Sequence, residues 1–87
     1  MVKERAMYSF MATDESLALV RKIVDRLRDA RRVQGLTLRE LSSMSGIDAG
    51  MISRAERGER WPSLAALLDL SKALNVKVSE ILAAEKR

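Results

Sequence analysis

The stretch that decides the fold is residues 37–58, which read TLRELSSMSGIDAGMISRAERG. It begins with a capping box, in which the Thr37 hydroxyl accepts from the Glu40 amide and the Glu40 carboxylate accepts from the Thr37 amide. Apolar residues then recur at helical spacing: Leu38, Leu41 and Met44. Gly46 ends this run, because glycine takes the left-handed conformation that closes a helix without steric cost. We therefore predict a helix near 37–45.

A second short helix follows this glycine almost at once. Asp48 can cap it, and Ile47 stands just before the cap, where a hydrophobic staple belongs. Its buried residues are expected to be Ile52 and Ala55. Gly58 supplies another glycine stop, so the helix is predicted near 48–57. Two short helices joined by a tight glycine turn must cross steeply, as in a helix-turn-helix.

Three further helices are predicted around this motif, near 16–34, 63–74 and 78–84. The first carries one apolar stripe, formed by Leu17, Val20, Ile23, Val24, Leu27 and Ala30. Residues 59–62 are expected to form a loop, because the residue before Pro62 avoids helical backbone, and Ser63 can then cap the next helix. The prediction is an all-α, five-helix domain over 16–84, with an N-terminal extension at 1–15 and a C-terminal tail at 85–87.

Composition excludes several classes of function. The 87 residues include no cysteine and no histidine, so the chain cannot form a disulfide, a usual zinc site or a Ser-His-Asp unit. No apolar run approaches the roughly 18 residues that a membrane helix needs. We expect a cytoplasmic protein that is not an enzyme. No catalytic residue, metal, cofactor, small-molecule substrate or membrane contact is predicted.

The charge of the chain points weakly to a polyanionic partner. Sixteen basic residues against twelve acidic ones give a net charge of +4. The excess lies in 16–34, whereas 35–58 is neutral. We expect the basic residues of the first helix to form a solvated face, with one exception. Arg31 is predicted to pair with Glu56, which needs a cation because it lies in the last turn of its helix.

The segment from Ile23 to Leu82 resembles the Cro/C1 (Xre-type) helix-turn-helix family of phage repressors and bacterial regulators. The residues that carry the resemblance are Arg31, Gly35-Leu36-Thr37, Leu41, Gly46-Ile47, Ile52-Ser53-Arg54, Glu56-Arg57-Gly58, Pro62-Ser63 and Leu74-Asn75-Val76. The resemblance implies a lambda-repressor-like domain that binds double-stranded DNA, with its third helix in the major groove. It also implies a sequence-specific transcriptional regulator, repressor-like and associated with the nucleoid.

The resemblance also implies which residues meet DNA. The base-contacting residues would be Ala49, Gly50, Met51, Ser53 and Arg54. Arg54 is the strongest of them, because its guanidinium can donate two hydrogen bonds to guanine O6 and N7. The phosphate-contacting residues would be Thr37, Leu38, Arg57, Arg60 and Ser63.

Two alternatives to direct base reading stay open. Many relatives carry Gln at position 38 and polar residues at 49 and 50, where this chain has Leu38, Ala49 and Gly50. DNA shape could therefore carry more of the specificity. Alternatively, the chain could be a protein-interaction module or an antitoxin-like partner protein that keeps the fold with little base reading.

A homodimer on a palindromic operator is the expected assembly, because one recognition helix rarely gives useful affinity. The predicted interface is apolar and lies near the C-terminal helix: Val76, Val78, Ile81 and Leu82. A second apolar patch is offered by Met7, Tyr8, Phe10 and Met11.

Overall fold

The computed structural model describes residues 13–85, which form five α-helices and no strand. The helices are α2 (Asp14–Val33), α3 (Leu38–Ser45), α4 (Ala49–Glu56), α5 (Leu64–Leu74) and α6 (Val78–Glu85). Each helix end lies within two residues of its predicted position, and the all-α prediction is confirmed. The largest difference is at α2, which begins at Asp14 because Thr13 caps it by accepting from the Ser16 amide.

The ends of the motif helices follow the local rules that the sequence indicated. Thr37 forms both hydrogen bonds of the capping box with Glu40. Asp48 caps α4 by accepting from the amide of Met51. Gly46 closes α3 in the left-handed region at φ 77°, a conformation in which a side chain would be strained. These caps fix the short turn between α3 and α4, so the two helices cross steeply.

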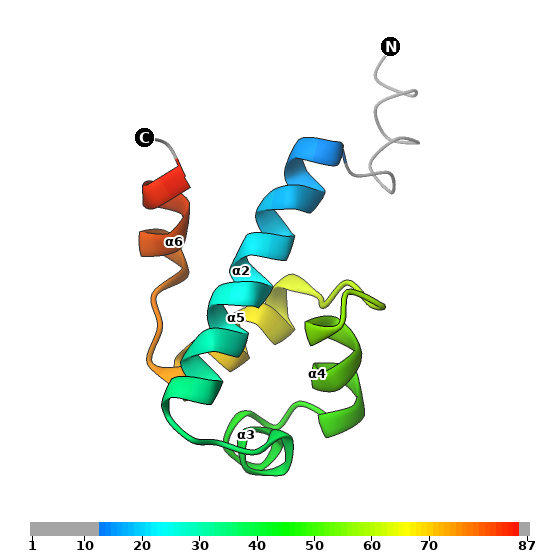
Figure 1. The fold of residues 1–87 in the computed structure, drawn as a ribbon, viewed down its shortest axis with the longest axis vertical. Coiled ribbons are helices and arrows are strands. Elements are labelled where there is room, and N and C mark those ends of the chain that lie inside the picture. The colour runs from blue at the N-terminus through cyan, green and yellow to red at the C-terminus, as the bar shows by residue number, and fades with distance from the viewer. Residues whose placement is uncertain (1–12, 86–87) are drawn as a thin grey trace.

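The core lies where α2, α3, α4 and α5 meet. Its buried apolar residues are Ile23, Val24, Leu27, Ala30, Leu41, Ile52, Ala55, Leu67, Leu70 and Leu74. Leu41, Ile52 and Leu74 are the most deeply enclosed of the larger side chains. The long helix α2 runs through the middle of the molecule, with α4 on one side and α6 on the other (Figure 1). The surface of α4 that faces away from α2 is therefore open to a partner.

Arg21 ties α2 to the end of α4, and this corrects the expectation of a wholly solvated basic face. Its Nη1 donates to the carbonyl of Ala55 at 3.1 Å, and its Nη2 donates to the carbonyl of Glu56 at 2.8 Å. Asp25, one turn along α2, holds the same guanidinium at 2.6 Å. The last carbonyls of a helix lack intrahelical partners and carry partial negative charge, which a cation satisfies.

Candidate nucleic-acid interface

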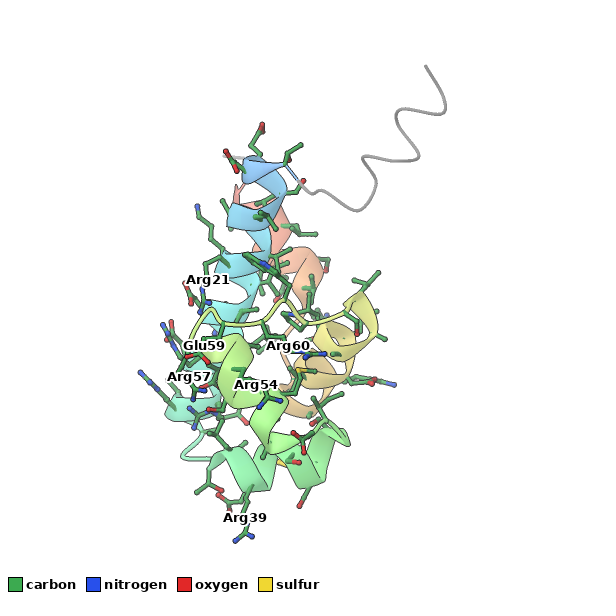
Figure 2. The ribbon with its side chains drawn as sticks, turned by 90° about the vertical axis from the view of Figure 1, so that its right-hand side faces the viewer. Arg21, Arg39, Arg54, Arg57, Glu59 and Arg60 are labelled. Atoms are coloured by element: carbon green, nitrogen blue, oxygen red, sulfur yellow. The ribbon has the colours of Figure 1, made fainter. Side chains whose placement is uncertain are left out.

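The five predicted base-contacting residues all lie on α4, and Arg54 is the most open of them. Ala49, Gly50, Met51 and Ser53 are half-buried, whereas Arg54 is exposed. Arg54 lies near the centre of the face that Figure 2 presents, with Arg57 to one side and Arg60 to the other. Arg54 is thus the long donor side chain best placed to reach a base edge.

Gly50 makes room for Arg54 to lie along the first turn of α4. A Cβ atom at position 50 would stand 2.9 Å from the Asp48 Oδ2 atom and 3.4 Å from Nη1 of Arg54. A larger residue at this position would displace the capping carboxylate or the guanidinium. The small Gly50 therefore favours the cap of α4 and the present placement of Arg54, although Gly50 itself can make no side-chain contact.

The N-terminus of α3 offers backbone donors in addition to the predicted Thr37 side chain, whose hydroxyl accepts from the Glu40 amide and can still donate its own O–H. The capping box uses the Thr37 hydroxyl and the amides of Thr37 and Glu40. Within the described part of the chain, the amides of Leu38 and Arg39 make no hydrogen bond. Free amides at the positive end of a helix are a suitable site for a phosphate. The predicted contact at Leu38 is therefore available through its backbone, since its side chain packs against the core.

Ser63 has the same arrangement at the start of α5. Its hydroxyl accepts from the amide of Ala66 at 3.1 Å, which fixes it at the N-terminus of the helix. A hydroxyl that accepts can still donate its own O–H, so both the Ser63 side chain and the backbone of the first turn are suited to a phosphate.

Arg57, predicted to contact phosphate, is paired with an acid that the sequence analysis did not assign. Its Nε lies 2.8 Å from Oε2 of Glu59, and its Nη2 donates to Oε1 of Glu59 at 3.2 Å. Its Nη1 donates to the hydroxyl of Ser53, one of the predicted base-contacting residues. Hydrogen bonding to Arg57 is the main reason that the pKa of Glu59 lies below its ordinary value. Glu59 is therefore a carboxylate at neutral pH.

Arg39 is a further basic residue on this surface that the sequence analysis left unassigned. It is the second residue of α3 and is exposed, beside the free amides of that helix. Figure 2 shows Arg39 on the same side of the molecule as Arg54 and Arg60. None of these three guanidinium groups has a hydrogen bond or ion pair with any residue in 13–85. The sequence could have indicated a phosphate contact by Arg39, because this residue lies in the first turn of α3, where phosphate contacts were expected.

The ion pair between Arg31 and Glu56 is present and largely enclosed. The Nε and Nη2 atoms of Arg31 each donate to one Glu56 oxygen at 2.8 Å. The two side chains are only 13% and 12% exposed. Arg31 also donates to the carbonyl of Leu36 at 2.8 Å, so it joins α2, α4 and the turn before α3. The hydrogen bond to Glu56 raises the pKa of Arg31 above its ordinary value.

The predicted dimer residues at α6 are less exposed than the sequence suggested. Val76, Val78 and Ile81 are half-buried and pack against the core, which leaves Leu82 as the exposed member at 39%. Three of the four residues predicted for a dimer interface are therefore used by the core of the monomer. The second predicted patch, Met7, Tyr8, Phe10 and Met11, lies outside the described residues.

No three acidic residues in 13–85 gather closely enough to hold a metal ion. None of the five helices is both long and apolar enough to cross a lipid bilayer.

Comparison with known proteins yields one family. A family model described as helix-turn-helix matches residues 27–81. The transcriptional regulator ClgR of Mycobacterium tuberculosis is 44% identical over 66 residues, which are 75% of this chain and 59% of ClgR. This chain thus spans less than two thirds of the length of that relative.

Two solved structures share the fold. The restriction-modification controller protein C.AhdI from Aeromonas hydrophila has a TM-score of 0.65 and 36% identity, over 74% of this chain and 97% of that one. The clp gene regulator ClgR from Corynebacterium glutamicum has a TM-score of 0.66 and 34% identity, over 75% of this chain and 69% of that one.

Proposed function

The chain belongs to the Cro/C1 (Xre-type) helix-turn-helix family of transcriptional regulators, and from this membership we propose that it binds an operator through the major groove. In this proposal α4 is the recognition helix, and Arg54 reads a base edge. The operator is palindromic, the protein is a repressor-like homodimer, and it acts in the cytoplasm at the nucleoid.

One observation carries the proposal: a single face combines a recognition helix with cations that make no hydrogen bond or ion pair within residues 13–85. Arg39, Arg54 and Arg60 lie on the same side of the molecule (Figure 2), and Arg39 belongs to the first turn of α3, where two amides are free. Phosphate contacts dominate protein–DNA affinity and fix the register in which base edges are read. The arrangement offers both kinds of contact at once, although the motif segment is neutral overall.

Selection from a random DNA pool by the purified protein, followed by sequencing, tests this function. We expect a recurring motif with two-fold symmetry, and binding that weakens steeply between about 50 and 200 mM salt. Affinity that ignores salt, or a pool that stays random, would contradict it.

A protein-interaction or antitoxin-like role is the second candidate, because Ala49 and Gly50 bring no polar side chain to the recognition helix. That role would be favoured if the protein captures a protein partner and the DNA pool it is offered stays random after selection.

A homodimer that forms without DNA is expected, because two copies double the contacts to the operator. The half-sites should lie about 34–36 Å apart, or a multiple of that spacing. Leu82 is the exposed apolar side chain of the predicted interface, so Leu82→Lys should weaken the dimer. Sedimentation at micromolar concentration measures this, and Lys72→Glu on α5 serves as an exposed control. A single species of 9.7 kDa in the wild type would contradict the preformed dimer.

A further inference from the structure

On the proposed DNA surface, the carboxylate of Glu59 accepts hydrogen bonds from Arg57, which is one of the predicted phosphate-contacting residues. All three nitrogens of the Arg57 guanidinium are engaged inside the protein: two with Glu59 and one with Ser53. Arg39, Arg54 and Arg60 on the same face have no such partner within residues 13–85. Arg57 is therefore the one predicted phosphate contact whose charge is already matched in the free protein.

We propose that Glu59 is an intramolecular counterion that masks Arg57, and that a DNA phosphate must displace it before Arg57 can contact the backbone. The inference rests on the proposed DNA-binding function. It means that Glu59 lowers the affinity of the protein for DNA, and that the contribution of Arg57 to this affinity depends on Glu59.

The backbone keeps Glu59 within reach of Arg57. Gly58 turns the chain at φ 78°, and the amide of Glu59 then donates to the carbonyl of Arg54 at 2.8 Å. This bond closes the end of α4 and fixes the position from which the carboxylate extends. The end of α4 thus positions Glu59, one residue beyond Gly58, beside Arg57.

The exposure of the pair makes it displaceable. The side chains of Arg57 and Glu59 are 54% and 55% exposed, so water and salt screen their attraction. The Arg31–Glu56 pair has the same chemistry, but its side chains are only 13% and 12% exposed. An exposed pair can exchange its carboxylate for a phosphate at small cost, whereas an enclosed pair cannot.

Displacement also frees an acceptor position on the recognition helix. The Ser53 hydroxyl accepts from Arg57 while the mask is in place. When Arg57 turns to a phosphate, this acceptor position becomes available to a donor on a base edge. Glu59 lines an open polar groove of about 650 Å³ in which Arg28 and Arg32, as well as the carboxylates of Asp25 and Glu56, also lie.

Glu59→Gln tests the mask. We expect this variant to bind non-specific DNA about 3–10-fold tighter than the wild type, because Arg57 gains a phosphate and a repelling charge is lost. The salt dependence, as the slope of log K against log [salt], should steepen by up to about 0.9 for one added phosphate contact. Titration of a labelled random duplex at several salt concentrations measures both.

A charge-matched control and a double-mutant cycle separate masking from general repulsion. Glu80→Gln changes the net charge equally, but it lies on α6, across α2 from the recognition helix (Figure 1). It should change affinity less than twofold. In an Arg57→Ala background, Glu59→Gln should fall to the level of this control, because the cation to which Glu59 is hydrogen-bonded is gone. Thermal unfolding of every variant checks that the fold is intact.

The outcomes are distinct. Masking is overturned if Glu59→Gln binds no tighter than Glu80→Gln, if it binds more weakly than the wild type, or if its gain persists without Arg57. A wild-type protein that binds no DNA at all removes the proposed function itself, and the mask with it.

Discussion

Glu56→Gln is expected to destabilise the fold by about 3 kcal/mol, the lower end of the range for breaking a buried ion pair. The change leaves the Arg31 guanidinium, 13% exposed, without a counterion between α2 and α4. Glutamine can keep one of the two hydrogen bonds to Arg31, which is why the effect should stay at the low end. For a domain of this size the thermal midpoint should fall by about 12–24 °C.

Urea and thermal unfolding measure this change, with Glu80→Gln as the exposed control, expected within about 0.5 kcal/mol of the wild type. Replacing both partners, as Arg31→Met with Glu56→Leu, should recover part of the loss, because no buried charge is then left unpaired. An unchanged midpoint for Glu56→Gln would show that the pair does not hold the fold together.

Most of the fold could be predicted because its decisive signals are local. The capping box at Thr37 and the glycine at position 46 act within one helical turn, so they are visible in the sequence itself. The apolar stripe of α2 likewise follows from residue spacing alone. The Arg31–Glu56 pair could be predicted for another reason, because a carboxylate in the last turn of a helix requires a cation.

The sequence does not indicate with which group each polar side chain forms its hydrogen bonds. Arg21 binds carbonyls 34 and 35 residues away, a pairing that no local rule indicates. The hydroxyls of Thr37 and Ser63 each accept from an amide of their own helix, and the sequence does not indicate whether their remaining O–H donors face a phosphate. Glu59 was unassigned because two residues in a loop can point together or apart with equal ease. The apolar residues of α6 looked surplus, since their burial depends on how α6 packs along α2.

Arg54→Ala is expected to remove most of the discrimination at one guanine of each half-site, a loss of about 1–3 kcal/mol against the wrong base. Arg54 is exposed on the recognition helix and has no hydrogen bond or ion pair within residues 13–85, so its donors are available. Competition binding with operators substituted at single positions measures the loss. Arg54→Lys keeps the charge but lacks the planar fork, and it should lose the same preference while retaining the salt dependence.

Arg60→Ala is the matched control, because it removes the same charge from the same face without touching α4. It should weaken binding to all sequences alike and flatten the salt slope, as expected of a phosphate contact. The difference between the two variants is what identifies Arg54 as the base-reading residue, since both lower the net charge equally. If Arg54→Ala and Arg60→Ala reduce affinity without changing sequence preference, direct reading by Arg54 is wrong. Specificity would then have to come from the shape and deformability of the operator.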